Sequence, residues 1–464
     1  MTAVSPSVLA RRLGPYDAAA IIVSNVIGGG ILFTPPQVAS QVPNPWLFLT
    51  TWIAGGALAF AGAMAYAELA ALRPKAGGEY VYLDAAFGRL AAFLTGWTSF
   101  VAGFSGAIAA SAVVFAFYLG RFIPIASSGE ALLTIPIPFV PLTFSPQSIV
   151  ALLVIGVMAA VHVRGVGPGR IVGNVLAGLK VTAFVAFIVL GFSIGAGSIA
   201  NLQASAGQVA PASWLLALIA VMFTYAGWNA AAYVAEEIRD PGRNVPLSLA
   251  IGTAAVIAIY LLLNVLYLYV FPVDRLAAVR GSVLDVIADR LLGARAGDIM
   301  GIVSLISLAA SISAMTIAGP RVYYAMARDG VFLPPAARVH PRYDTPAVSI
   351  VAQAMWSALL VLSGGASALI RYTGFAISLF SAIAVVALFV LRRREPDAPR
   401  PFKVLGYPVV PGIFAASMFL IVANAIYNDP RPSGAGALII LAGIPLYLVF
   451  ARRRAEARRL SAVS

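Results

Sequence analysis

The chain has 464 residues, of which 61% are hydrophobic and only 11% are charged. This balance excludes a soluble globular domain, because apolar runs of about 20 residues, long enough to cross a bilayer, recur along the whole sequence. The net charge of +13 does not indicate a nucleic-acid partner, since the basic residues gather in alternate connections between these runs. With no cysteine and no hydrolase or P-loop motif, the chain offers no thiolate metal site, and we expect neither an enzyme nor a bound cofactor.

The apolar runs predict an all-α integral membrane protein with twelve spans in a single membrane domain, 1–464. The spans are expected at 15–41, 46–70, 88–120, 147–163, 171–195, 212–236, 247–272, 297–325, 346–363, 368–391, 409–427 and 434–451. Basic clusters such as Arg11–Arg12, Arg392–Arg394 and Arg452–Arg454 lie on the N-terminal side of the membrane. The positive-inside rule therefore predicts a multi-pass protein with both termini in the cytoplasm. The excess of arginine over lysine and the abundance of alanine suggest a bacterial inner membrane.

The first span is interrupted by three consecutive glycines, Gly28, Gly29 and Gly30. Each glycine costs a helix about 0.8–1.0 kcal/mol relative to alanine, and irregular backbone inside a bilayer is tolerated only where protein buries it or it lines a watery cavity. A half-helix that starts here has unpaired N–H groups that an anion can approach, and the carbonyls of Val26 and Ile27 are left free for a cation. Alternatively, the glycines form a small-residue surface for close helix packing.

A second interruption, Thr224–Asn229, falls in the sixth span. Paired interruptions at matching places in two halves of a membrane protein are typical of a transporter's binding site. The free carbonyls between Phe223 and Gly227 add partial negative charge, so the two breaks together suit both ends of a zwitterion such as an α-amino acid. Residues of about 14–195 and 212–391 then form inverted five-span repeats, and 409–451 holds two accessory helices.

Lys180 lies well inside the fifth span, with apolar residues on both sides. A lysine near the bilayer centre costs about 2.5–3.5 kcal/mol on insertion scales and indicates a functional site. The alternative is that its long side chain reaches a helix end, where the amine meets water.

Several motifs occur in the order found in one transporter family. They are Asn25–Pro35, Tyr66–Leu69, Pro74–Tyr82, Phe223–Asn229, Glu236–Pro246 and Arg328–Gly330. Together they resemble the amino acid–polyamine–organocation family, with the L-type amino acid transporters and their bacterial relatives as the nearest branch. The resemblance implies a five-plus-five inverted-repeat fold like that of the leucine transporter, with discontinuous helices one and six and alternating access to a midplane site.

By position, the resemblance implies that the substrate carboxylate is held by the backbone of Gly28, Gly29 and Gly30. It implies that the substrate amino group contacts backbone carbonyls of the two breaks, at Val26, Ile27, Phe223 and Ala226, with Gly227 beside them in the second break. It also implies that the Phe223 ring is the outer gate. It also implies that Lys180 replaces a sodium ion, with Ser307 and Ser311 as hydroxyl partners, so that transport needs no sodium. Asn229 either contacts the ligand or holds the unwound backbone. Glu68, Tyr80, Glu236 and Glu237 fit inner-gate or loop-anchoring roles instead.

No acidic or basic side chain is expected in the cavity to bind a charged substrate side chain. We therefore expect neutral L-amino acids as substrates, moved by a facilitator, an exchanger or a proton-coupled symporter; the alternative is a proton-coupled permease or antiporter for cationic amino acids or polyamines. An ion channel is disfavoured, because no ring of charges or repeated carbonyl filter is found. In the L-type branch that the sequence resembles, eukaryotic members are joined by a disulfide to an ancillary glycoprotein. This chain has no cysteine, so that covalent partnership is not expected.

Overall fold

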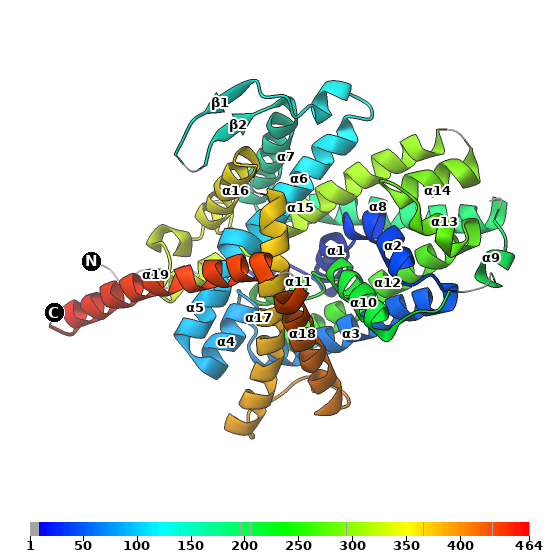
Figure 1. Cartoon of the computed structure of the whole chain (residues 1–464). Coiled ribbons are helices and arrows are strands. Elements are labelled where there is room, and N and C mark those ends of the chain that lie inside the picture. The colour runs from blue at the N-terminus through cyan, green and yellow to red at the C-terminus, as the bar shows by residue number, and fades with distance from the viewer. Residues whose placement is uncertain are drawn as a thin grey trace.

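The computed structural model is almost entirely helical (Figure 1). It describes residues 9–138, 140–194, 197–203, 207–293, 295–364, 366–428 and 430–463, without the side chains of 366–374 and 453–463. Residue 195, where the fifth predicted span ends, lies outside the described residues. The two strands, β1 (Leu133–Ile135) and β2 (Leu142–Phe144), form one antiparallel hairpin in the connection between the third and fourth spans.

Nine helical segments in the described part of the chain are long and apolar enough to cross a membrane. They are α3 (Pro45–Leu72), α5 to α6 (Arg89–Leu119), α7 (Pro146–Val163), α8 (Val166–Ile194), α12 (Pro241–Val270), α15 (Ala296–Arg328), α17 (Ala366–Arg394), α18 (Val409–Asn428) and α19 (Pro430–Val463). A tenth is a bent pair, α1 (Pro15–Val26) and α2 (Gly30–Gln41), and two shorter apolar helices are α10 (Pro211–Thr224) and α16 (Ala347–Leu362). Each predicted span thus has a helical counterpart, and the predicted all-α membrane architecture is confirmed.

Two helices begin earlier than hydropathy predicts. Helix α12 starts at Pro241 and α8 at Val166, whereas the spans were expected from 247 and 171. The first turn of α12 carries polar residues, which give no apolar signal although proline at the first helical position favours a helix start. These helices therefore extend beyond their apolar segments.

Shorter elements connect the spans. They are α4 (Glu79–Phe87), η2 (Pro124–Ser127), α9 (Ala200–Gln203), α11 (Ala230–Tyr233), η3 (Ala235–Glu237), α13 (Val273–Ala277), α14 (Val283–Leu292) and η4 (Pro334–Ala337). The connection between α12 and α15 is largely helical. Helix α14 buries one apolar side, including Leu284 and Ile287, and packs against α15 and α8.

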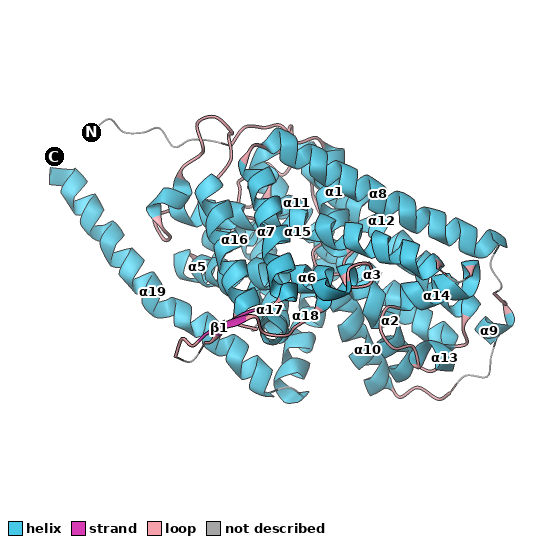
Figure 2. Cartoon of the chain, turned by 90° about the horizontal axis from the view of Figure 1, so that it is seen from above, coloured by secondary structure: helices cyan, strands magenta, loops and turns pink. Residues whose placement is uncertain are grey.

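The centre of the molecule is built from α1, α3, α12 and α15. Helix α15 is the most enclosed of the spanning helices described, with 78% of its apolar window buried, whereas α19 has only 17% of its window buried. Figure 2 shows α19 running along one side of the body towards the C-terminus. Equivalent spans of the two expected halves pack on each other: α3 on α12, α6 (Phe104–Leu119) on α15, and α7 on α16.

Candidate binding site between two helix breaks

The first break separates α1 from α2, whose axes differ in direction by 50°. Ile27 caps α1, Gly28 and Gly29 lie between the two helices, and α2 starts at Gly30. A Cβ atom on Gly30 would lie 3.1 Å from the Cα atom and 2.9 Å from the Cγ2 atom of Thr224. A Cβ atom on Gly29, in contrast, would meet nothing within 4 Å. Glycine at 30 therefore allows close approach to the second break, and glycine at 29 leaves open space.

The second break separates α10 from the short helix α11, with residues 225–229 in turns. Gly227 has a φ of +106°, which side-chain-bearing residues rarely adopt, and a Cβ atom there would lie 2.6 Å from Asn25 Nδ2. The Asn25 amide donates a hydrogen bond of 3.1 Å to the Gly227 carbonyl. The two breaks, about 200 residues apart in sequence, thus contact each other directly. Figure 1 shows α1, α2, α10 and α11 together near the middle of the molecule.

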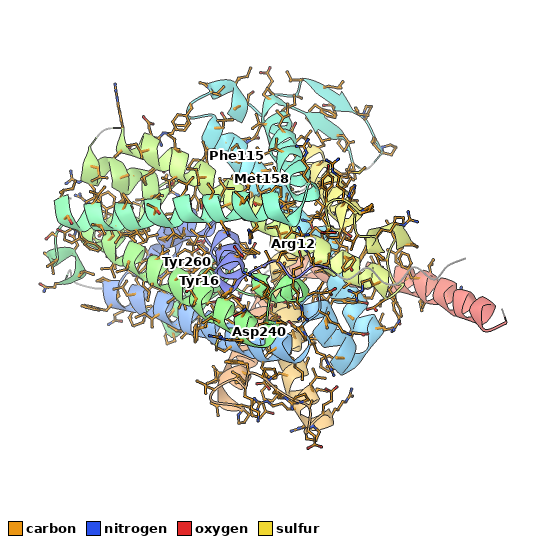
Figure 3. All side chains as sticks on the ribbon, turned by 180° about the vertical axis from the view of Figure 1, so that it is seen from behind. Arg12, Tyr16, Phe115, Met158, Asp240 and Tyr260 are labelled. Atoms are coloured by element: carbon orange, nitrogen blue, oxygen red, sulfur yellow. The ribbon has the colours of Figure 1, made fainter. Side chains whose placement is uncertain are left out.

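Tyr260 of α12, labelled in Figure 3, joins the backbone of both breaks. Its hydroxyl lies 2.9 Å from the Val26 carbonyl oxygen and 3.4 Å from that of Thr224. A carbonyl that ends a helix lacks an intrahelical donor, so a hydroxyl on a neighbouring helix satisfies it without closing the break. The Val26 carbonyl, expected to be free, already accepts one hydrogen bond and retains one lone pair.

Lys180 of α8 is fully buried beside the first break. Its ammonium donates to the carbonyls of Ser24, at 3.1 Å, and of Ile27. Two hydroxyls of α15 reach the same carbonyls: Ser307 Oγ lies 3.0 Å from the Ile27 oxygen, and Ser311 Oγ lies 2.8 Å from the Ser24 oxygen. The end of α1 is thus held by the Lys180 side chain and two hydroxyls.

A cavity of about 450 Å³ adjoins both breaks. It lies among α2, α6, α10, α15 and α17, within the size range of small-molecule sites. The sequence-predicted site residues that line it are Val26, Gly28, Gly29, Gly30, Phe223, Ala226, Gly227, Asn229 and Ser311. Ile27, Lys180 and Ser307 do not line it; they are fully buried and support the break from the opposite side. The Phe223 side chain, expected as a gate, is 52% exposed.

The expectation that the cavity holds no acidic group is wrong. Glu79, the first residue of α4, lines the cavity and is only 9% exposed. Its Oε1 atom accepts hydrogen bonds from Tyr66 OH at 2.6 Å, Asn229 Nδ2 at 3.0 Å and Ser381 Oγ at 3.5 Å. Sequence reasoning missed Glu79 because these donors come from three separate elements. The one available signal was Gly77–Gly78 before it, where two positive φ angles turn the chain inwards.

Asn229 lies at the cavity, and the two hydrogen bonds of its amide nitrogen found among the described residues go to side chains rather than to the unwound backbone. It donates to Glu79 and, at 3.2 Å, to the Tyr233 hydroxyl. The sequence also gave no sign of the π-helix η1 (Ser99–Gly103), which widens the third span where Ser99 and Gly103 line the cavity. Such π-bulges often occur at functional sites.

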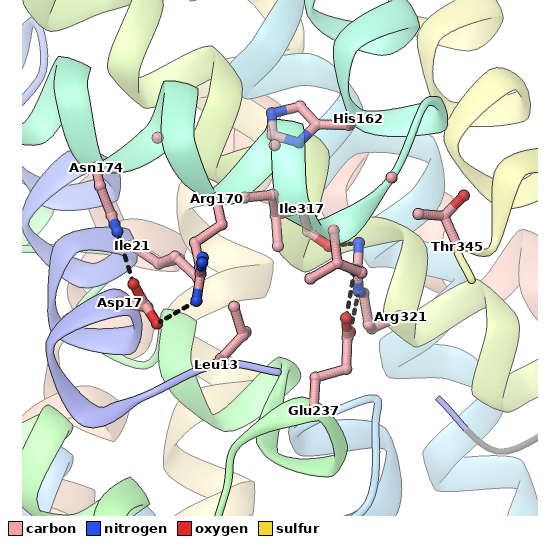
Figure 4. A pocket seen from close by; sticks show the side chains of 14 residues that line it. Leu13, Asp17, Ile21, His162, Arg170, Asn174, Glu237, Ile317, Arg321 and Thr345 are labelled. Atoms are coloured by element: carbon pink, nitrogen blue, oxygen red, sulfur yellow. Dashed lines mark hydrogen bonds and ion pairs between the residues drawn. The ribbon is translucent and has the colours of Figure 1, made fainter. Parts of the chain in front are cut away.

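The residues expected as inner-gate or loop-anchoring groups do not line this cavity; three of them form ion pairs and Tyr80 donates a hydrogen bond to a carboxylate. Glu237 accepts two hydrogen bonds from the Arg321 guanidinium, at 2.6 and 2.9 Å, and the pair is almost fully buried (Figure 4). Glu236 pairs with Arg328 at 2.9 Å, Glu68 pairs with Arg392 at 2.6 Å, and Tyr80 donates to Asp329 at 2.8 Å.

The segment before α1 and the first turn of α1 make further contacts beside the Glu237–Arg321 pair. Leu13 exchanges backbone hydrogen bonds with the 237–239 segment, and Asp17 accepts from Asn174 of α8 at 2.6 Å (Figure 4). This end of the molecule is therefore tied together by backbone pairing as well as by ion pairs.

The chain is similar in sequence to known transporters over most of its length. The family model described as amino acid permease matches residues 13–450. The chain is 30% identical over 451 residues to the mouse (Mus musculus) large neutral amino acids transporter small subunit 2, covering 95% of this chain and 81% of the relative. It is 24% identical to a serine/threonine exchanger of Bacillus subtilis (strain 168), covering 97% and 98%. It is 29% identical to the rat (Rattus norvegicus) b(0,+)-type amino acid transporter 1, covering 95% and 88%.

Proposed function

The chain belongs to the amino acid permease family of multi-pass membrane transporters, and from this premise we propose that it carries neutral L-amino acids by alternating access, without sodium. The observation that supports this proposal best is the contact between two helix breaks at one cavity of about 450 Å³. Both poles of a zwitterion find complementary backbone groups there. On the cavity side of the breaks these groups are backbone N–H and carbonyl groups, and Lys180 contacts the first break from outside the cavity.

In this proposal the substrate carboxylate binds the N–H groups of Gly28, Gly29 and Gly30 at the start of α2. These groups lack intrahelical acceptors, and the helix dipole favours an anion at this end. The substrate amino group binds carbonyls of the first break, at Val26 and Ile27, and of the second, at Phe223 and Ala226. Because the Ile27 carbonyl already accepts from Lys180, Ser307 and Ser311, the Val26 carbonyl is the better acceptor for the ligand.

Independence from sodium is proposed from the position of the Lys180 ammonium. Carbonyl and hydroxyl oxygens are the ligands a sodium ion would need, and here they surround a fixed cation instead. A second positive charge in the same oxygen cluster would be repelled over a few ångströms in a low-dielectric interior.

Alternating access is proposed from the contrast between the two ends of the molecule. The cavity reaches between α2, α6 and α10, whereas the buried Glu237–Arg321 pair closes the opposite end. We place the protein in a bacterial inner membrane with both termini in the cytoplasm. In that orientation the cavity opens towards the outside of the cell. The packing of α3 on α12, α6 on α15 and α7 on α16 supports inverted repeats at about 14–195 and 212–391, with accessory helices at about 409–451. Since the sequence has no cysteine, we also propose that no ancillary subunit is joined by a disulfide.

The alternative, a permease or antiporter for cationic amino acids or polyamines, is favoured by one observation. Glu79 places a carboxylate in the cavity, where it faces any side chain that extends past Asn229. A basic side chain would compete there with the donors that Glu79 already has, and the neutral substrate therefore remains our first choice.

Counterflow in proteoliposomes tests the proposal. Vesicles loaded with each of the twenty L-amino acids, agmatine or putrescine are diluted into the labelled form of the same compound. We expect labelled neutral amino acids to accumulate transiently, at the same rate when choline replaces sodium. Accumulation of cationic compounds alone would overturn the substrate class, and a large loss in choline would overturn the role given to Lys180.

A further inference from the structure

Glu79 is the only acidic or basic side chain among the residues described as lining the cavity. The other glutamates near the core have arginine partners, as Glu68 has Arg392 and Glu237 has Arg321. No ion pair of Glu79 is found among the described side chains. A carboxylate that is buried, faces a cavity and lacks a cationic partner needs a physical explanation, since burial of an unpaired charge is costly in a membrane protein.

The neighbours of Glu79 are neutral groups that can hold a carboxyl group with or without a proton. Its donors Tyr66, Asn229 and Ser381 come from α3, the second break and α17. The ionisable side chains facing it are tyrosines: Tyr66 from α3, Tyr82 from α4 itself and Tyr233 from α11. Hydroxyl groups rotate between donating and accepting, so they can bind the carboxylate or receive a hydrogen bond from the carboxylic acid.

Charge balance shows what a proton at Glu79 would accomplish. A neutral amino acid enters as a zwitterion and adds no net charge, so an ionised Glu79 would remain unpaired when the cavity closes and loses its water. Closure strengthens every electrostatic interaction inside, and the cost of the lone charge rises with it. A proton taken up from the cavity before closure removes that cost.

Lys180 does not fit this role in the same conformation. It is fully buried, lies outside the cavity lining, and its ammonium protons are used on the Ser24 and Ile27 carbonyls. Lys180 therefore has no direct contact with the cavity through which a proton could enter or leave, whereas Glu79 lines the cavity.

We propose that Glu79 is the proton-binding site of this carrier, and that a proton bound there accompanies each neutral amino acid through the cycle. The inference rests on the proposed function, because it needs a zwitterion at the two breaks. The proton adds to the Glu79 carboxylate while the cavity is open on one side. It leaves from the same group once the cavity opens on the other.

The experiment compares two measurements on each reconstituted variant: counterflow, and uptake driven by an inward gradient of about 2 pH units. The probe is whichever of labelled leucine, alanine or serine gives the strongest counterflow. One proton per substrate allows up to roughly 100-fold accumulation, because each pH unit contributes tenfold. We expect wild type and the control Glu130→Gln, changed in an exposed outer loop, to accumulate the probe. Glu79→Gln should lose accumulation relative to its own counterflow, and Glu79→Asp should recover part of it.

The outcomes separate the two proposals. Absence of counterflow in wild type would overturn the proposed function. Counterflow without gradient-driven accumulation in wild type, or accumulation that survives in Glu79→Gln, would overturn only the role of Glu79. If wild type shows counterflow of lysine or arginine and Glu79→Gln does not, Glu79 binds a cationic substrate rather than a proton. That outcome would also overturn the role of Glu79.

If Glu79→Gln transports no substrate, a second variant tests the role of Glu79. Tyr66→Phe removes one donor to the carboxylate but keeps the titrating group. Because that donor stabilises the ionised form, its loss should move the midpoint of the pH profile of uptake to higher pH. A profile unchanged in position would contradict the proposal, since a merely structural Glu79 would lower the rate without moving the midpoint.

Discussion

Neighbouring glycines of the first break have different physical roles, and substitution should separate them. Gly29→Val would place its side chain in open space at the cavity, so we expect uptake to be abolished while the melting temperature stays close to wild type. Gly30→Ala would press on the Thr224 backbone, and overpacking of this kind typically costs about 1–3 kcal/mol.

Uptake assays and thermal denaturation of the purified proteins check this pair. A Gly29→Val protein that transports at the wild-type rate would show that the substrate carboxylate does not bind at this position. Equal melting temperatures for Gly30→Ala and wild type would show that the two breaks do not need this close approach.

The Lys180 side chain acts on the ligand only through the end of α1. In Lys180→Ala, the Ile27 carbonyl keeps the Ser307 and Ser311 hydroxyls but loses the ammonium. We expect transport to slow by about tenfold or more while the Kd for substrate changes by less than about threefold, because the lost group supports the break rather than the substrate. Ligand-dependent thermal shifts give the affinity and initial uptake rates give the transport. A Kd that rises as much as the rate falls would place Lys180 in ligand binding instead.

At the level of elements, the second break depends on one glycine with a positive φ. Gly227→Ala would strain the backbone at φ +106° and bring a Cβ atom within 2.6 Å of Asn25 Nδ2. Strain of this kind costs about 1–3 kcal/mol, so we expect lower thermal stability and reduced uptake together.

Gly178→Ala is the matched control for Gly227→Ala. Gly178 lies within α8, and a Cβ atom there would meet nothing within 4 Å, so alanine should be neutral or slightly stabilising. Similar losses of thermal stability and uptake in both variants would mean that an added methyl group harms the protein at either position. That result would contradict a special role for Gly227.

The two breaks could be predicted from sequence because glycine and apolar patterns are local. Three glycines in an apolar run signal an interruption whatever surrounds them. Glu79 could not be predicted as a cavity residue, because its environment depends on Tyr66, Asn229 and Ser381, which only the folded chain brings together. The η1 bulge was missed for a related reason, since its sequence, Ser99–Gly103, has no feature that distinguishes it from an ordinary helix.

On the scale of the whole molecule, the orientation proposed from the distribution of basic residues has a direct test. The chain has no cysteine, so any single cysteine introduced is the only reactive thiol. Leu133, 57% exposed in the β1–β2 hairpin, and Leu405, 84% exposed between α17 and α18, lie on opposite sides in the proposed topology.

We therefore expect a membrane-impermeant maleimide added to intact cells to label Leu133→Cys and not Leu405→Cys. Both variants should react after the cells are opened, which controls for accessibility. Labelling of Leu405→Cys in intact cells, with Leu133→Cys protected, would reverse the orientation and place the termini outside.

A positive charge built into the polypeptide at α8 has a consequence for physiology. A diffusible metal ion must be collected from the surroundings at every turnover, and its supply varies with habitat. In the sodium-independent transport that we propose, the Lys180 side chain takes the place of such an ion and is part of the chain, so the first break would keep its shape in fresh water and in brine alike. Scarcity of salt would then set no limit on how fast such a cell feeds.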